Sequence, residues 1–274
     1  MFIIFGSPRS GTTLLKETLN LHSDLFVPMQ TTFISTAAHV LGSVSTWKHA
    51  SRLIANMIVQ SDDYISVLSP YMTEADIRYA VAHATPSLAG VLEAVYGAMA
   101  ANLGKRLCGD KSPDDLLAVR KLEQLGLLES DVKFIHIVRD VRGSVASLLK
   151  VDWAPPRIEQ YFPRIWNYTN LHLYEAMAGK SNYVLLKYED FLASPEAALR
   201  QITNLLGVPF QPAMLDPTMR GMALRDNPSH RNLSQPFLPD RIGAWRGELS
   251  SELVAHCERS ASEAMRAFGY VQEA

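Results

Sequence analysis

The chain has 274 residues, of which 47% are hydrophobic and 20% are charged, enough apolar material for one buried core and too little length for several domains. Lysine and arginine total 26 against 28 acidic residues, so a broad surface for nucleic acid or for an anionic membrane is not expected. The two cysteines, Cys108 and Cys257, belong to no metal-ligand spacing, which disfavours a metal centre and a disulfide framework. We therefore expect a single domain over residues 1–274.

Residues 2–5 form a short apolar run that Gly6 closes. The run is too short for a secretory signal or a membrane span, so we expect a cytoplasmic protein. In residues 10–20, leucines recur at the spacing of one helix face. The chain is therefore expected to begin with a strand, a tight loop and a helix.

Residues 30–105 are largely apolar and show helical rather than alternating patterns, which are clearest in segments 50–59 and 88–103. We expect a helical insertion here. After it, residues 133–138 are rich in β-branched and aromatic side chains, and a helical segment follows over residues 141–150. This is a second unit of strand, turn and helix.

A third predicted strand, residues 183–186, precedes a helix over residues 195–206. Residues 228–239 hold prolines and polar side chains typical of a loop, and residues 250–268 predict a closing helix. Strands that alternate with helices indicate an α/β fold, with a central parallel sheet flanked by helices. In such a sheet, ligands bind beyond the carboxyl ends of the strands.

The loop between the first strand and the first helix has the sequence GSPRSGTT at residues 6–13. Glycines let successive backbone N–H groups face one anion, and the start of the following helix adds partial positive charge. A nucleoside-triphosphatase loop would place a lysine after Gly11, where this chain has Thr12. The loop is therefore suited to a 5′-phosphate that carries one further anionic group, and its positive side chain is Arg9.

The string GSPRSGTTLL resembles the 5′-phosphosulfate-binding loop of sulfotransferases that use 3′-phosphoadenosine-5′-phosphosulfate (PAPS), of the bacterial type and of the type that modifies protein tyrosines. The resemblance implies a three-layer fold like that of the P-loop nucleoside triphosphatases. It implies PAPS as the sulfuryl donor, adenosine 3′,5′-bisphosphate (PAP) as the product, and no metal. It also implies that the 5′ end of the nucleotide binds to Arg9, Ser10, Gly11, Thr12 and Thr13.

Arg139 ends a predicted strand, and Ser147 lies eight residues on in the next helix, so both can point into one crevice. An arginine offers a planar fork of donors to a phosphate, and a serine can complete the grip. The segment resembles the strand and helix that hold the 3′-phosphate in the same family, which implies Arg139 and Ser147 as the binding pair. Arg142 and Ser144 also fit a role in helix capping. Tyr188 resembles a tyrosine near the nucleotide, and it equally fits a packing role.

Lys111 lies in the segment DKSP, residues 110–113. The segment resembles the Lys-x-Pro segment of the sulfotransferases that modify protein tyrosines, in which the lysine contacts the oxygen that bridges phosphate and sulfate. Negative charge grows on that oxygen as its bond to sulfur breaks, and a preorganised cation stabilises this charge. The resemblance thus implies Arg9 and Lys111 as catalytic residues.

The acceptor must lose a proton when it takes the sulfuryl group. In related enzymes a glutamate about twenty residues past the loop arginine accepts this proton, and here Gln30 stands in that place on the acceptor side. Glutamine can hydrogen-bond a hydroxyl but cannot accept its proton. Three alternatives stay open: a different base, an acceptor that is already ionised, or a chain with reduced activity. The candidates for a different base are Asp110, His39, His49 and His83.

Together these features predict a sulfotransferase that moves a sulfuryl group from PAPS to a hydroxyl or amine by in-line displacement. The insertion over residues 30–105 would form the acceptor side, and its apolar character favours a small apolar molecule, with a sugar or a tyrosine as alternatives. Two other classes compete. One is a non-catalytic relative that binds PAPS or PAP, and the other is a P-loop kinase, against which the missing lysine argues.

Overall fold

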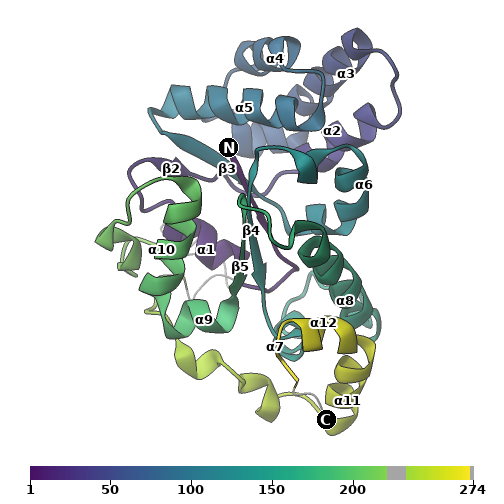
Figure 1. The fold of residues 1–274 in the computed structure, drawn as a ribbon, viewed down its shortest axis with the longest axis vertical. Coiled ribbons are helices and arrows are strands. Elements are labelled where there is room, and N and C mark those ends of the chain that lie inside the picture. The colour runs from purple at the N-terminus through teal and green to yellow at the C-terminus, as the bar shows by residue number, and fades with distance from the viewer. Residues whose placement is uncertain (221–232, 272–274) are drawn as a thin grey trace.

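The computed structural model describes residues 1–220 and 233–271. Its centre is a sheet of five parallel strands with helices on both faces (Figure 1). The order across the sheet is β2-β3-β1-β4-β5. The strands are β1 (Phe2–Phe5), β2 (Leu25–Phe26), β3 (Leu107–Lys111), β4 (Lys133–Val138) and β5 (Tyr183–Lys187). The α/β class predicted from the alternating strands and helices is confirmed.

The central strand β1 is buried on both faces. Phe2 and Ile4 pack into one apolar cluster, and Ile3 and Phe5 pack into another, because alternate side chains of a strand point to opposite faces of the sheet. All four are 0% exposed. A strand buried in this way needs a continuous apolar run, which explains why the sequence shows no alternation there.

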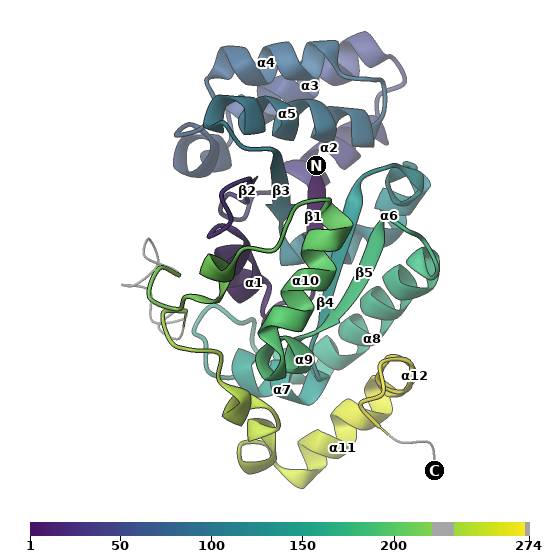
Figure 2. The ribbon, with the colours of Figure 1, turned by 60° about the vertical axis from the view of Figure 1, so that its left-hand side comes forward.

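Two helical layers cover the sheet (Figure 1, Figure 2). On one side lie α1 (Thr12–Leu19), α9 (Tyr188–Ala193) and α10 (Pro195–Leu206), and on the other lie α6 (Val119–Gln124) and α8 (Ile158–Met177). The long helix α8 was not predicted. Pro163 lies inside it, and a proline normally ends or kinks a helix. The helix α7 (Val141–Leu148) follows β4 and packs against α8.

Residues 30–105 are helical, as predicted, and contain α2 (Phe33–Leu41), α3 (Trp47–Val59), α4 (Glu74–His83) and α5 (Leu88–Leu103). The helices α3, α4 and α5 lie beside residue 1, at the amino end of β1 (Figure 1, Figure 2). The loop over residues 6–13 follows the other end of this strand. Several parts of the segment reach the carboxyl edge of the sheet. Thr31 and Tyr96 of α5 both contact Asp110 near the end of β3, and Asp63 accepts hydrogen bonds from Thr32.

The C-terminal region adds two helices to the layer formed by α7 and α8. The predicted helix over residues 250–268 is divided into α11 (Ser251–Ser260) and α12 (Ser262–Ala267), because the backbone of Ala261 leaves the helical conformation at φ −123° and ψ 22°. Of the predicted loop over residues 228–239, residues 228–232 lie outside the described part. Among the described helices, none has both the length and the apolar composition that a membrane crossing needs.

Candidate active site

The loop between β1 and α1 makes a tight turn. The backbone N–H and the hydroxyl of Ser10 both donate to the carbonyl oxygen of Ser7, at 3.1 and 2.7 Å. Arg9 and Gly11 have positive φ angles of 66° and 95°. A Cβ atom added at Gly11 would lie 2.4 Å from Cδ2 of Tyr188. Glycine is therefore required at this position both for the backbone angle and for the space.

The first turn of α1 is open to a ligand. Gly11 is the N-cap residue, no side chain caps the helix, and the first turn contains no acidic residue. The backbone N–H groups that begin an α-helix have no partner within the helix, and they carry partial positive charge. The loop and the helix start, with Thr12 and Thr13, therefore form a cradle that fits a phosphate or sulfate group.

Arg9, Arg139 and Ser147 meet although they are far apart in the sequence. Nε of Arg9 donates to Oγ of Ser147 at 2.9 Å, and Nη1 of Arg139 donates to the carbonyl oxygen of Arg9 at 3.0 Å. The Arg139 guanidinium lies 4.6 Å from the centre of the Tyr188 ring. Burial, and then the charge of Arg139, lowers the pKa of Arg9. In the described part of the chain neither arginine pairs with a carboxylate, so both guanidinium groups can bind an anion.

A chain of buried hydrogen bonds anchors the loop between β1 and α1 to the core of the protein. Asn170 on α8 donates from Nδ2 to Oγ of Ser7 at 2.8 Å, and its Oδ1 lies 2.9 Å from Nε2 of His136. Because an amide oxygen only accepts, the proton of His136 lies on Nε2, and Nδ1 accepts from the hydroxyl of Tyr183 at 2.9 Å. Burial lowers the pKa of His136 to about 4, so its ring is neutral at neutral pH. The loop is thereby tied to β4, β5 and α8.

One cleft joins the loop, α7 and the segment over residues 233–248. It contains all the residues predicted to bind the nucleotide except Ser10, whose hydroxyl points into the loop. Further basic and apolar side chains complete the walls, and they were not predicted as site residues. These are Lys150, Leu192, Leu233, Phe237, Leu238, Arg241 and Trp245. The cleft thus combines several basic side chains with apolar and aromatic walls. Glu248 also lines it and pairs with Lys150 at 2.5 Å.

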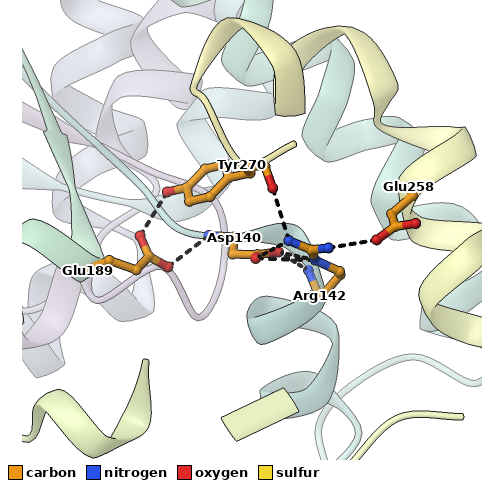
Figure 3. Close-up of polar contacts among 5 residues, drawn as sticks. All are labelled: Asp140, Arg142, Glu189, Glu258 and Tyr270. Atoms are coloured by element: carbon orange, nitrogen blue, oxygen red, sulfur yellow. Dashed lines mark hydrogen bonds and ion pairs between the residues drawn. The ribbon is translucent and has the colours of Figure 1, made fainter. Parts of the chain in front are cut away.

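A network of charged groups fixes the backbone next to the cleft (Figure 3). Arg142 donates to Asp140 at 2.7 Å, to Glu258 of α11 at 2.6 Å and to the carbonyl oxygen of Tyr270 at 3.2 Å. Glu189 accepts from the backbone N–H of Asp140 and from the hydroxyl of Tyr270, at 3.1 and 2.8 Å. Arg142, whose role the sequence left open, is therefore engaged in ion pairs. The network ties the residues beside Arg139 and Tyr188 to the C-terminal helices.

Lys111 ends β3 beside Ile4 of β1, so it lies at the same edge of the sheet as the loop. Its side chain is 5% exposed and does not line the cleft. Burial lowers the pKa of Lys111 to about 8, and the charge of Lys16 adds to this effect. Lys16, in α1, pairs with Glu17 at 2.6 Å. The two lysines lie next to the loop together with the carboxylates of Glu17, Asp110 and Asp114.

Gln30 has a hydrogen-bond partner at this edge of the sheet. Its Nε2 atom donates to Oδ2 of Asp114 at 3.1 Å. Asp110, one of the alternative bases, is 1% exposed and accepts hydrogen bonds from the hydroxyls of Tyr96 and Thr31. Burial raises the pKa of Asp110 to about 6 despite these bonds. Both hydroxyls bind Oδ1, whereas Oδ2 is buried without a partner. An acceptor could therefore reach Oδ2 only if the surrounding packing opened.

The three histidines proposed as alternative bases are exposed residues of the helical insertion. The ring of His49 contacts the hydroxyl of Thr46 at 3.0 Å, and the ring of His83 contacts the carbonyl oxygen of Tyr79 at 2.8 Å. His39 lies in the last turn of α2. None of the three is among the charged groups that shift the pKa of Lys111.

Sequence reasoning missed Lys16, Asp114, Glu189 and the wall of the cleft around Trp245. A signal existed for Asp114, which lies three residues past Lys111 in the sequence. It also existed for Lys16, one turn into the helix that follows the phosphate loop. Glu189 follows Tyr188, but its partners lie in distant parts of the chain, so no local pattern could reveal its role.

Comparison with known proteins gives a consistent result. The model described as "Sulfotransferase family" matches residues 2–212 of this chain. A protein-tyrosine sulfotransferase A of Caenorhabditis elegans is 24% identical over 277 residues, which cover 97% of this chain and 66% of that protein. A protein-tyrosine sulfotransferase 1 of Danio rerio is 26% identical over 223 residues, which cover 78% of this chain and 55% of that protein. The chain spans between about half and two thirds of the length of these curated relatives.

Solved structures agree in fold. The sulfotransferase domain of the Synechococcus olefin synthase superposes with a TM-score of 0.65 at 22% identity, covering 100% of this chain and 95% of that domain. The sulfotransferase domain from the curacin biosynthetic pathway gives a TM-score of 0.60 at 20% identity, covering 96% of each chain. A mouse sulfotransferase in complex with PAP gives 0.54 at 13% identity, covering 97% of this chain and 83% of that one. The three-layer fold like that of the P-loop nucleoside triphosphatases is thereby confirmed.

Proposed function

Because the chain belongs to the sulfotransferase family, we propose that it transfers a sulfuryl group from PAPS to an acceptor hydroxyl and releases PAP. The observation that carries this proposal is the meeting of Arg9, Arg139 and Ser147 in one cleft. A nucleotide with anionic groups at its 5′ and 3′ positions needs two anion sites side by side. The 5′-phosphosulfate would bind to residues 9–13, and the 3′-phosphate would bind to Arg139 and Ser147.

The rest of the cleft suits the nucleoside. Tyr188 and the aromatic side chains of Phe237 and Trp245 line it together with Leu238. Flat aromatic and apolar surfaces favour a purine ring, which buries its faces by stacking. The adenine would therefore lie between Tyr188 and the segment over residues 233–248.

Transfer would be an in-line displacement at sulfur, helped mainly by positioning and by charge. The acceptor oxygen attacks the sulfur atom while the bond between sulfur and the bridging oxygen breaks, and the electron pair of that bond stays on PAP. Arg9 and Lys111 would stabilise the leaving oxygen. This role requires Lys111 to be charged. Because its pKa is lowered to about 8, the rate of transfer should fall as the pH rises through this value.

The acceptor side supports a hydroxyl carried by an apolar or aromatic body. Met29, which is next to Gln30 in the sequence, is 39% exposed. Leu117, which lies three residues past Asp114, is 58% exposed. In a 3-10 helix such as that of residues 113–118, side chains three residues apart lie above one another. A small phenol-like molecule fits these features. The names of the curated relatives make a tyrosine hydroxyl the second candidate.

Two other functions compete with this proposal. A P-loop kinase would need a lysine after Gly11 to reach the β- and γ-phosphates, and the chain has Thr12 there. A silent relative would bind PAP without transferring sulfate, as the glutamine at position 30 allows. The first alternative predicts binding of ATP with magnesium, and the second predicts binding of PAP without turnover.

Calorimetric titration with PAP, beside titration with ATP and magnesium, tests the nucleotide site. We expect selective binding of PAP that is weakened by about 10- to 100-fold in Arg139→Ala, because a charge-assisted pair of hydrogen bonds is lost. Arg164→Ala, which changes an exposed arginine of α8, serves as the matched control and should bind as the wild type does. Preference for ATP, or no binding of PAP, would refute the proposed function.

A further inference from the structure

Sulfuryl transfer to a hydroxyl releases a proton, and a group near the reacting oxygen must accept it. This inference rests on the proposed function, and it concerns the identity of that group. Four charged residues act on Lys111, namely Lys16, Glu17, Asp110 and Asp114. Three of them are acids and therefore candidates for the base.

Two of these acids are largely buried. Asp110 is 1% exposed and holds the hydroxyls of Tyr96 and Thr31. Glu17 pairs with Lys16 at 2.6 Å, and its side chain is 13% exposed. Asp115, the neighbour of Asp114, is also buried at 1% exposure. None of these carboxylates can meet an incoming acceptor without a rearrangement of the site.

Asp114 differs from them in exposure and in position. It is exposed at the start of the 3-10 helix over Pro113–Ala118, which begins two residues after Lys111 ends β3. Gln30 donates to its Oδ2 atom at 3.1 Å. Among the described residues, no hydrogen bond reaches its second oxygen, Oδ1. One carboxylate oxygen is thus held, and the other is free to accept a proton.

The two segments that carry this pair are anchored independently. Next to Gln30, the sulfur atom of Met29 accepts from Nζ of Lys16 at 3.3 Å. On the other side of Gln30, Thr31 contacts the buried Asp110 at 3.5 Å. Asp114 follows β3, which pairs with β1 through Lys111. Two fixed segments therefore bring Gln30 and Asp114 together beside the lysine.

We propose that Asp114 is the general base of the transfer reaction and that Gln30 is a positioning residue that orients its carboxylate. As the acceptor oxygen bonds to sulfur, its proton passes to Oδ1 of Asp114. The bond between sulfur and the bridging oxygen breaks, and its electron pair remains on the 5′-phosphate of PAP. Asp114 then releases the proton to water. The glutamine at position 30 is in this way compatible with catalysis, because the carboxylate comes from the 3-10 helix that follows β3.

The test compares two phenols as acceptors for the wild type and Asp114→Asn. Phenol keeps its proton at neutral pH, whereas p-nitrophenol is largely ionised at pH 8 and needs no base. We expect Asp114→Asn to lower kcat with phenol by about 10²- to 10⁴-fold, the usual contribution of a general base. The loss with p-nitrophenol should be much smaller, and the affinity for PAP should not change.

Two further variants separate a chemical role from a structural one. In the double variant Gln30→Glu, Asp114→Asn, a carboxylate returns on the other side of the same hydrogen bond, and we expect it to restore activity with phenol by about tenfold or more. Asp131→Asn, which changes an exposed aspartate away from this edge, is the control and should behave as the wild type does. Equal losses with both phenols, or wild-type activity of Asp114→Asn with phenol, would overturn the assignment.

The outcomes also separate this inference from the proposed function. A wild-type chain that does not bind PAP refutes the proposed function itself. A wild-type chain that transfers sulfate, together with an Asp114→Asn variant that does so equally well, refutes the role of Asp114 alone. Transfer to water is measured as hydrolysis of PAPS. A wild-type chain that binds PAP but transfers sulfate neither to the phenols nor to water refutes both the proposed function and the role of Asp114.

Discussion

Lys111 is a buried lysine for which we propose a catalytic role. Its folded pKa is lowered to about 8, first by burial and then by the charge of Lys16. The ammonium is charged below this value and loses its proton as the pH rises through it. In the role that we propose for Lys111, the charged form stabilises the leaving oxygen, so this lysine would impose an upper limit on the pH range of the reaction.

We predict that kcat with p-nitrophenol falls as the pH rises through about 8, a value set by burial of the lysine. Lys111→Arg should remove this decline, because arginine stays charged at all these pH values. Lys111→Met should lower kcat by about 10²- to 10³-fold at pH 7 without changing the affinity for PAP. A steady-state pH profile of the three proteins measures these effects, and identical profiles for the wild type and the arginine variant would contradict them.

His136 makes stability depend on pH. The folded pKa is lowered to about 4 by burial, against about 6.5 in an unfolded chain. Between these values the unfolded chain binds more protons than the folded one, so stability falls as the pH falls below about 6.5. We expect this residue to remove about 2 kcal/mol from the free energy of unfolding between pH 7 and pH 5.

Urea denaturation at pH 7 and pH 5 tests the role of His136, with His136→Gln as the comparison. Glutamine is not ionised in this range, so the variant should lose about 2 kcal/mol less than the wild type between the two pH values. The other titrating groups contribute equally to the pH dependence of both proteins, so the difference between the two proteins reports His136 alone. Equal losses in the two proteins would show that His136 is protonated in the folded state.

At the scale of elements, the junction of β1 and α1 depends on Gly11. Its φ angle is 95°, and a Cβ atom there would lie 2.4 Å from the Tyr188 ring. We predict that Gly11→Ala lowers the free energy of unfolding by about 1–3 kcal/mol and weakens PAP binding. Gly97→Ala in α5, where nothing lies within 4 Å of the added atom, should be neutral or stabilising by up to about 1 kcal/mol. Chemical denaturation of both variants decides the matter.

The C-terminal helices depend on Arg142, whose partners are shown in Figure 3. Arg142→Met would leave Asp140, which is 8% exposed, without its ion pair. We expect a loss of about 3 kcal/mol, as for other broken buried pairs. Arg200→Met is the matched control, since its pair with Glu196 is more than half exposed and should contribute less than about 1 kcal/mol. Hydrogen exchange should rise in α11 and α12 of the first variant only.

At the scale of the whole molecule, the cleft is built from segments that are distant in sequence. The loop after β1, the start of α9, the helix α7 and residues 233–248 all line it. A ligand that contacts these segments binds only the folded chain, so it raises the stability of the whole molecule.

We predict that PAP at about 100 times its dissociation constant raises the midpoint of thermal unfolding by about 5–10 °C. AMP, which lacks the 3′-phosphate, should give a clearly smaller shift at the same concentration, because it cannot engage Arg139 and Ser147. Differential scanning fluorimetry measures both shifts. Equal shifts would mean that the 3′-phosphate is not recognised.

The sequence by itself was sufficient for features that depend on local pattern. The tight loop between β1 and α1, the strand β4 and the helix α5 were predicted closely, because glycine spacing and apolar periodicity act within a few residues. The resemblance of the loop to a known family then indicated the chemistry, and the match of the family model to residues 2–212 confirmed that membership.

Only the tertiary structure could decide which distant side chains meet. It joins Arg9 to Ser147 across 138 positions and Gln30 to Asp114 across 84, and no local pattern encodes such contacts. It also places α3, α4 and α5 beside the amino end of β1, while Tyr96 of α5 contacts Asp110 near the carboxyl end of β3. The physical reason is that periodicity shows which face of an element is apolar, while packing against the rest of the chain determines what covers that face.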